Sequence, residues 1–363
     1  MIPVAEPDLR GNELAYVSEC IETEWVSSLG KYVAAFEQRM AEMCQRRYAI
    51  SVCNGTAALH LALATLGIGP GDEVIVPSMT FVATANAVVY CGAEPVFCDS
   101  EAAYWQIDPL AIEALITPRT KAIIPVDLYG HPVDMDAIQQ IARAHDLYVI
   151  EDAAEAHGAM YKSVPCGGMG DMSCFSFYGN KVVTTGEGGM ILCDDASWYE
   201  RACFLRDHAM SKTERYYHPE IGFNYRITNV QAALGVAQLE RIDQFCEIKI
   251  RNAHRYAERL ASVPGITLQP EADWAKSVFW MYSVLVDETF PLSRDELAKA
   301  LKQRGVDTRP FFRAIHTMPS HPRSVYLPVA EDLAARGMNL PSSTKLTLEQ
   351  VDYVSQQIAE LAK

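Results

Sequence analysis

Short β-rich runs alternate with helical patterns between residues 50 and 195 of this 363-residue chain. The runs are EVIV (73–76), EPVFCD (94–99), KAIIPV (121–126), LYVIED (147–152), SCFSF (173–177) and GMILCD (189–194). Helices are expected at 56–66, 135–145 and 197–208, with Gly67 as a stop signal after the first. This alternation is typical of an α/β sheet with helices on its faces.

The pattern changes after Thr228, which suggests a second domain. A long amphipathic stretch runs to Val263, Pro264 and Gly265 interrupt it, and a strand is expected at 278–286. Two further segments, SRDELAKALKQRG and TLEQVDYVSQQIAELA, are rich in good helix formers. We therefore expect two domains, 1–244 and 245–363.

Composition excludes several classes of protein. Hydrophobic residues make up 49% and charged residues 21% of the chain, which is ordinary for a soluble globular protein. The net charge of -15 argues against a nucleic-acid partner. The uncharged run 74–93 is interrupted by Pro77 and polar residues, and the start of the chain does not resemble a secretory signal, so no membrane partner is expected. Ten cysteines without a C-x-x-C pair indicate reduced thiols in a cytoplasmic protein.

Four segments follow strands or open helices, where an open α/β sheet binds its ligand. Asn54 to Ala58 opens a helix whose N-terminus suits a phosphate, although Asn or Thr there is also an ordinary cap. Glu151 to Glu155 places acids at a strand end, as site residues or as caps. Lys181 lies between an aromatic strand and a glycine-rich turn, where partial desolvation favours a neutral amine able to form a Schiff base. Residues 222–226, GFNYR, form a turn before the next helix.

Other cofactor sites have no support in the sequence. Neither G-x-G-x-x-G nor G-x-x-x-x-G-K-[ST] occurs, which argues against nicotinamide and nucleoside triphosphate sites. The nine histidines show no ligand cluster, so we expect no catalytic metal. His60, His131 and His157 are expected to be structural imidazoles with satisfied hydrogen bonds.

Several motifs resemble those of the DegT-like, pyridoxal-phosphate-dependent nucleotide-sugar aminotransferases. They are TEWVSSLGKYVAAFE (23–37), NGTAALHLAL (54–63), PSMTFVATANAV (77–88), LYGHPVDM (128–135), EDAAEAHGA (151–159), FSFYGNKVVTTGEGGM (175–190) and GFNYRITNVQAALG (222–235). The resemblance covers nearly the whole chain. It implies the aspartate aminotransferase-like fold (PLP fold type I), with a large, mixed and mostly parallel sheet domain and a smaller C-terminal α+β domain.

The resemblance also implies roles for individual residues at matching positions. Lys181 and Asp152 correspond to the catalytic pair, Lys181 as the Schiff-base lysine and Asp152 as the partner of the pyridine nitrogen. A carboxylate there keeps the ring protonated, so that the ring can absorb the electrons of a carbanion. The remaining cofactor-binding positions are Thr56, Ala57 and Ser176 for the phosphate, Asn224 for the phosphate of a neighbouring subunit, Phe81 stacked on the ring, and Glu155 near its phenolic oxygen. Many family members have Gln at the position of Glu155.

Within the family, EDAAEA, GNK-x-x-TTGEGGM, HTMP (316–319) and AEDLAARGMNLPS (330–342) are most similar to the GDP-perosamine synthases. This implies transfer of an amino group from glutamate to the C4 ketone of a GDP-4-keto-6-deoxy-mannose-like sugar, by a homodimer with shared sites. Alternatives are a C3 or C4 aminotransferase of a UDP- or dTDP-ketosugar, and a cofactor-binding regulator without turnover. The sugar 3-dehydratase branch has histidine at the lysine position, so Lys181 argues against it. Substrate contacts are expected from Trp25, Val26, Ser27, Ser28, Tyr217, His218, Thr308 and Arg309, by resemblance only.

Overall fold

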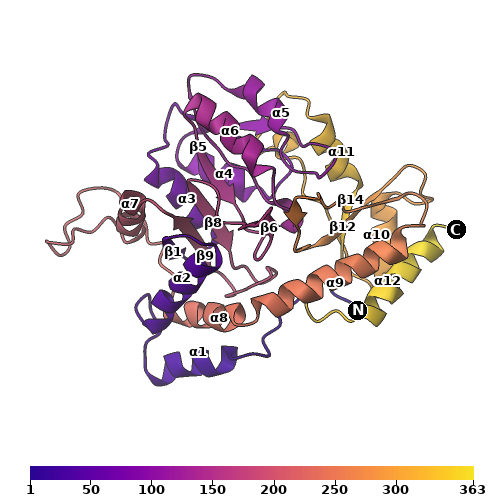
Figure 1. The fold of residues 1–363 in the computed structure, drawn as a ribbon, viewed down its shortest axis with the longest axis horizontal. Coiled ribbons are helices and arrows are strands. Elements are labelled where there is room, and N and C mark those ends of the chain that lie inside the picture. The colour runs from indigo at the N-terminus through magenta and orange to yellow at the C-terminus, as the bar shows by residue number, and fades with distance from the viewer.

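A seven-stranded sheet lies at the centre of the larger part of the molecule (Figure 1). The computed structural model describes all residues from 1 to 363. The strand order is β1-β9-β8-β5-β4-β2-β3; β8 to β3 are parallel, and β9 and β1 join antiparallel at one edge. The expected mixed, mostly parallel sheet is therefore confirmed. Its strands are β1 (Tyr48–Val52), β2 (Glu73–Pro77), β3 (Glu94–Cys98), β4 (Thr120–Ile123), β5 (Tyr148–Asp152), β8 (Met172–Ser176) and β9 (Gly189–Cys193).

Helices surround this sheet, and the number of sides that each helix buries matches the distribution of its apolar residues. The helix α3 is apolar on nearly all sides and is buried along most of its length, because it packs against the sheet, α4 and α7. By contrast, α6 buries only one side through Met135, Ile138 and Ala142. The helices of this part are α1 (Glu13–Glu22), α2 (Lys31–Met43), α3 (Gly55–Thr65), α4 (Ala83–Tyr90), α5 (Pro109–Ile112), α6 (Met135–His145), α7 (Ala196–Arg206) and α8 (Asn229–Leu239), with 3-10 turns at Glu113–Leu115 and Leu128–Gly130.

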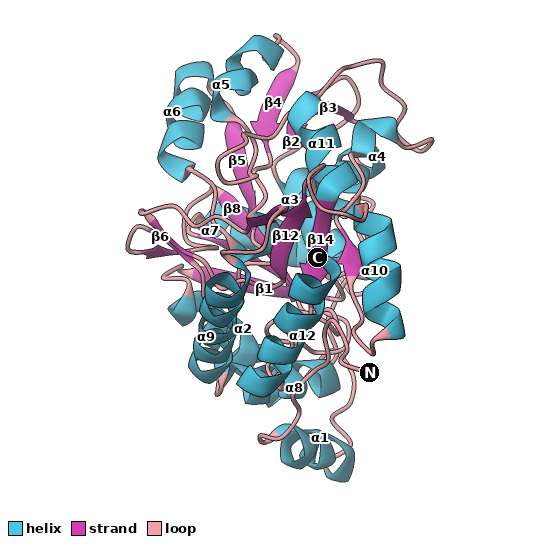
Figure 2. Cartoon of the chain, turned by 90° about the vertical axis from the view of Figure 1, so that its right-hand side faces the viewer, coloured by secondary structure: helices cyan, strands magenta, loops and turns pink.

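A second, antiparallel sheet of four strands lies in the C-terminal part, in the order β10-β12-β14-β13. Figure 2 views the molecule from this side and shows β12 and β14 near the upper end of α12. The elements are α9 (Ile242–Leu260), β10 (Ile266–Leu268), β12 (Tyr282–Val286), α10 (Arg294–Gln303), β13 (Arg309–Pro310), a 3-10 turn (Ile315–Thr317), α11 (Pro328–Arg336), β14 (Gly337–Leu340) and α12 (Leu348–Leu361). A small sheet of β11 (Ala275–Lys276), β6 (Met160–Tyr161) and β7 (Val164–Pro165) lies apart from both.

The long helix α9 connects two hydrophobic cores. Phe245 and Cys246 belong to a core that includes β8, β9 and α2, whereas Ala253, Tyr256 and Leu260 pack in the core of the four-stranded sheet. Figure 1 shows α9 extending from α8 to lie beside α12. We propose that the division expected at residue 245 falls within this helix.

Two expected elements differ from the structure. The long amphipathic stretch after Thr228 is two helices, α8 and α9, separated at Glu240 and Arg241. The strand expected at 278–286 begins only at Tyr282, because the backbone of Val278 bonds to Gly130 instead of to a neighbouring strand of the sheet. This irregular segment carries Trp280 towards the large sheet.

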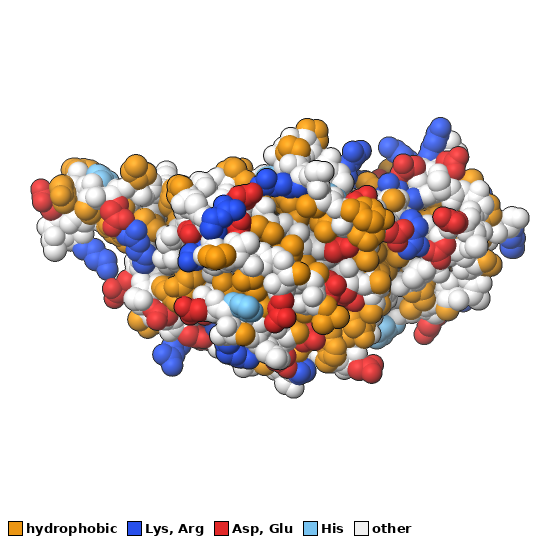
Figure 3. All heavy atoms as spheres, turned by 90° about the horizontal axis from the view of Figure 1, so that it is seen from above, with side chains coloured by type: hydrophobic (Ala, Val, Ile, Leu, Met, Phe, Trp, Pro, Cys, Tyr) orange, Lys and Arg blue, Asp and Glu red, His pale blue; other side chains and the backbone are white.

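The surface and helices add two observations. No helix is both long and apolar enough to cross a membrane. On the face drawn in Figure 3, acidic and basic side chains are interspersed, and no broad basic area is visible. Because the net charge of the chain is -15, an anionic ligand must be held by a few local groups rather than by a general attractive field.

Candidate active site

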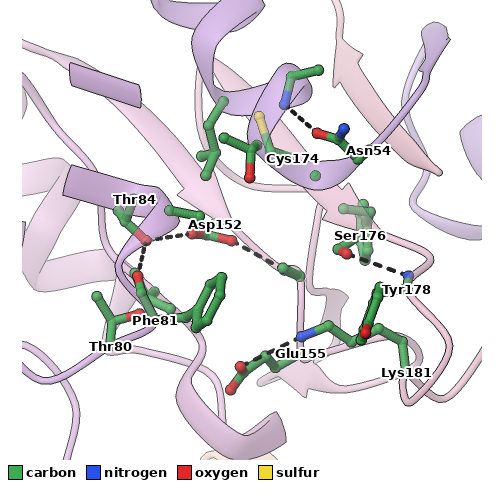
Figure 4. Close-up of a pocket in the computed structure, with 18 of the residues that line it drawn as sticks. Asn54, Thr80, Phe81, Thr84, Asp152, Glu155, Cys174, Ser176, Tyr178 and Lys181 are labelled. Atoms are coloured by element: carbon green, nitrogen blue, oxygen red, sulfur yellow. Dashed lines mark hydrogen bonds and ion pairs between the residues drawn. The ribbon is translucent and has the colours of Figure 1, made fainter. Parts of the chain in front are cut away.

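A deep cavity lies at the ends of β5 and β8 and at the start of α3. Its volume is about 630 Å³, which suits a small-molecule ligand. Seven of the residues expected to bind the cofactor line it: Thr56, Ala57, Phe81, Asp152, Glu155, Ser176 and Lys181. Figure 4 shows that Phe81, Asp152, Glu155, Ser176 and Lys181 come from separate segments of the chain and surround one space.

The start of α3 and the end of β8 form one side of the cavity. The Asn54 side chain caps the helix by accepting a hydrogen bond of 2.8 Å from the Ala57 N–H. Gly55 is required for close approach, because a Cβ there would lie 2.7 Å from the Cβ of Ser176. The helix N-terminus and the Ser176 hydroxyl are thus next to each other, a donor set that suits a phosphate group.

Asp152 is a buried acid at the end of β5. Its Oδ2 accepts a hydrogen bond of 2.8 Å from the Thr84 hydroxyl, and its Oδ1 accepts one of 3.3 Å from the Ala154 N–H. Burial raises the pKa of Asp152, against the opposing effect of these donors and of Lys181. A protonated ring nitrogen beside it would offset that burial and favour the carboxylate.

Lys181 lies opposite, in the loop between β8 and β9, with a side chain that is 10% exposed. Its Nζ lies 3.5 Å from Oε1 of Glu155 and 3.8 Å from the centre of the Trp280 ring. Burial lowers the pKa of Lys181, while Glu155 and Asp152 act in the opposite direction. A lowered pKa increases the fraction of neutral amine, which is the nucleophilic form.

Glu155 and Phe81 form further walls. Oε2 of Glu155 accepts a hydrogen bond of 2.8 Å from the Tyr129 N–H, and burial raises the pKa of this carboxyl. Phe81 is 55% exposed although it lines the cavity, and its ring centre lies 5.6 Å from that of Phe312. An exposed aromatic ring inside a cavity is suited to stacking on a flat ligand.

These residues together fit pyridoxal phosphate. Phosphate donors, a buried acid for a ring nitrogen, an aromatic face and a desolvated lysine are arranged around one cavity. Each feature alone has an ordinary structural explanation, but their combination matches the chemistry of this cofactor.

The other expected site residues do not line this cavity. Asn224 is exposed, in the segment after α7 that leads back to α8, and accepts a hydrogen bond from Arg226. The exposed groups Trp25 to Ser27 and Tyr217 with His218 also lie outside the cavity lining, and exposed Arg309 pairs with Asp307. Within one chain, these residues are separate from the Lys181 cavity.

The structure brings in residues that sequence reasoning missed. Thr84, Tyr129, Trp280 and Phe312 all contact the expected site residues. Thr84 lay within a recognised motif (77–88), but nothing in its spacing links it to Asp152. Trp280 and Phe312 come from the C-terminal half, and no local pattern indicates which aromatic residue reaches a distant cavity.

The histidine expectations have a mixed outcome. Nδ1 of His60 lies 3.0 Å from the Tyr225 hydroxyl, and His131 hydrogen-bonds through both ring nitrogens. The prediction is wrong for His157, whose buried ring nitrogens have no hydrogen-bond partner in the chain. The ring packs between Phe175 and Phe177, and burial lowers its pKa to about 3, so it remains a neutral, largely apolar spacer.

One buried cluster outside the cavity resembles a metal site in composition. Ligand atoms of Asp127, Glu151 and Cys166 lie within 4.8 Å of one another. Both Glu151 oxygens already accept backbone N–H groups, from Gly167 and Met169. Burial and the neighbouring acids raise the pKa of the Cys166 thiol, which disfavours the thiolate that binds a metal, so the cluster gives little support for a metal site.

Comparison with known proteins gives a consistent result. The model of the DegT/DnrJ/EryC1/StrS aminotransferase family matches residues 7–359. The GDP-perosamine synthase of Caulobacter vibrioides is 48% identical over 97% of this chain and 96% of its own length, and that of Escherichia coli O157:H7 is 45% identical over 99% and 98%. The crystal structure of S. venezuelae DesV in complex with a ketimine intermediate is 36% identical, with a TM-score of 0.91 over 97% of this chain and 94% of that one. The chain belongs to the DegT/DnrJ/EryC1/StrS aminotransferase family.

Proposed function

We propose that this enzyme transfers an amino group from glutamate to the C4 ketone of a GDP-4-keto-6-deoxy-mannose-like sugar, giving a GDP-4-amino sugar such as GDP-perosamine. The observation that carries the aminotransferase chemistry is the convergence of Lys181, Asp152 and Glu155 in one cavity. The sugar nucleotide is supported by the GDP-perosamine synthases, which are 48% and 45% identical over nearly the whole chain. A cytoplasmic location is supported by ten free cysteines.

Bound pyridoxal phosphate supplies an electron sink for the pair left when a C–H bond of the amino donor breaks. Thr56, Ala57 and Ser176 would bind its phosphate, and the exposed ring of Phe81 would be available for stacking. Asp152 holds a proton on the ring nitrogen through a charge-assisted hydrogen bond. These residues would hold the cofactor in the cavity that Lys181 also lines.

The amine of Lys181 would hold the cofactor and, when neutral, could accept and return a proton of the substrate. Its desolvated position favours the neutral amine that this role requires. Glu155 hydrogen-bonds the Lys181 amine and the Tyr129 N–H, which keeps the lysine directed into the cavity.

We further propose that the active unit is a homodimer with shared sites. Asn224, which corresponds to a phosphate ligand from a neighbouring subunit, is exposed and lies outside the cavity of its own chain. An exposed position away from the cavity suits a residue that reaches a second subunit.

A panel of ketosugars tests the substrate proposal. We expect the GDP-4-ketosugar to be aminated with a kcat/KM up to ~10⁴-fold higher than its UDP or dTDP counterparts, because groups built to hydrogen-bond guanine stay unpaired with another base. Glutamate should be the best donor, and Lys181→Ala, as a control, should aminate none of them. Equal or better use of a dTDP-sugar would favour the alternative. A dTDP-3-amino-3,4,6-trideoxy-alpha-D-glucose transaminase of Streptomyces venezuelae is 37% identical over 92% of this chain.

A further inference from the structure

Lys249 is a buried lysine at the junction of the two cores. It lies on α9 between Cys246, which packs in the larger core, and Ala253, which packs in the smaller one. Only 6% of the residue is exposed. Its Nζ donates hydrogen bonds of 3.0 Å to the Trp280 carbonyl and 2.7 Å to the Ser342 carbonyl.

No carboxylate forms an ion pair with Lys249. The titratable groups near it are Cys246 on its own helix, Tyr256 on the next turns and Tyr282 on β12. Burial lowers the pKa of Lys249 to about 8. Burying an ammonium group without a counter-ion is costly. We therefore expect that its hydrogen bonds to the two carbonyls have a role beyond stabilising the fold.

Trp280, whose carbonyl Lys249 holds, is a wall of the active site. Its ring centre lies 3.8 Å from Nζ of Lys181, and its indole N–H donates a hydrogen bond of 2.8 Å to the Asn180 carbonyl. The indole therefore contacts the reacting lysine and the residue before it. A shift of Trp280 would change the packing and the electrostatics of the Lys181 amine.

The segment around Trp280 belongs to no strand and depends on specific contacts for its position. On one side it lies against Gly130, whose carbonyl accepts hydrogen bonds from the Val278 N–H and the Ser277 hydroxyl. A Cβ on Gly130, which has a φ of +90°, would lie 2.7 Å from the backbone nitrogen of Trp280. On the other side, the Trp280 carbonyl is held by Lys249.

We propose that Lys249 is a positioning residue for the reaction: by holding the Trp280 carbonyl, it keeps the indole against Lys181 and Asn180. Lys249 touches neither the cavity nor the reacting atoms. The inference rests on the proposed function only in taking Lys181 as the reacting amine. Through its position on α9, Lys249 connects the core of the four-stranded sheet to the active site.

The indole N–H signals of the full-length protein test this without relying on turnover. The chain has five tryptophans, and Trp280→Phe identifies the Trp280 signal in an amide-and-indole NMR spectrum. We expect that signal to shift with pH with a midpoint near 8, in the free and in the cofactor-loaded protein, as Lys249 loses its proton. In Lys249→Met the signal should move and this titration should disappear. A midpoint that persists in Lys249→Met belongs to Lys181 and overturns the proposal.

Asn252→Ala is the matched control. Asn252 lies three residues further along α9, is equally buried, and donates to the Leu346 carbonyl without contacting Trp280. We expect Lys249→Met to lower kcat about 10-fold, with a change in KM below about 2-fold, whereas Asn252→Ala leaves the Trp280 signal and kcat near wild type. Equal effects of the two variants would mean that Lys249 acts only through general stability and would overturn the proposal. If Lys249→Met does not fold, the titration is followed in Lys181→Ala, which lacks the other amine near the indole: a Trp280 signal without a midpoint near 8 is the negative result. If the wild-type protein has no aminotransferase activity at all, the proposed function is contradicted. The NMR titration would still test whether Lys249 positions Trp280.

Discussion

Replacement of Asp152 by asparagine is expected to separate cofactor binding from chemistry. The phosphate contacts near Thr56 and Ser176 remain, so the variant should retain much of its cofactor, having lost one charge-assisted hydrogen bond worth roughly 1.5 to 3 kcal/mol. A neutral amide cannot hold a proton on the ring nitrogen, so turnover should fall by at least about 100-fold. Cofactor absorbance after gel filtration measures the first effect and single-turnover rates the second. A variant with a near wild-type rate would show that Asp152 has another role.

A single site residue could be predicted from the sequence only where it lies in a contiguous motif. Lys181 and Asp152 lie in segments whose strand, glycine and acid patterns are contiguous, and both line the cavity. Trp280 and Thr84 could not be placed, because their contacts with Lys181 and Asp152 join segments about 100 and 68 residues apart. Unlike the local motifs, such contacts depend on the complete fold.

Asp127, in the segment after β4, and Glu151, in β5, form a second pair of buried acids whose titration should affect stability. Burial first, and the charge of Glu151 second, raise the pKa of Asp127 well above its usual value. Because the folded state then binds more protons than the unfolded state, Asp127 lowers stability as the pH rises from about 4 towards its folded pKa, by about 1.4 kcal/mol per pH unit. Asp127→Asn keeps the shape without this titration. We therefore expect Asp127→Asn to gain stability relative to wild type as the pH rises: the difference between their melting temperatures should shift in favour of the variant from pH 5 to pH 8.

Asp146→Asn is the control, because Asp146 is an exposed acid at the C-terminus of α6 in a left-handed conformation that asparagine accepts. Its melting curve should follow wild type at each pH. Parallel pH profiles for Asp127→Asn and wild type would mean that the Asp127 carboxyl is already ionised at pH 5.

Strands and helices could be predicted where the hydrophobic periodicity is strong. The predictions failed where tertiary contacts determine the bounds of an element. The helix expected at 135–145 has those bounds, and all six β-rich runs form strands of the large sheet. The break between α8 and α9 and the late start of β12 were missed. In the latter case, a bond between Val278 and Gly130 replaces strand pairing, and the β-rich composition of 278–281 gives no sign of that partner.

Mixing two inactive variants tests whether the active unit shares its sites between subunits. Lys181→Ala removes the reacting amine, and Asn224→Asp places a negative charge where a partner's phosphate is proposed to bind. In a hybrid dimer, one site would combine the Lys181 of one chain with the Asn224 of the other, both intact, so mixing should restore up to about a quarter of wild-type activity if subunits exchange at random. Two differently tagged copies of wild type measure the exchange. Complete exchange without recovered activity would mean that Asn224 serves the site of its own chain. That result would require the exposed segment containing Asn224 to fold back towards the Lys181 cavity, because the single chain does not place Asn224 in its lining.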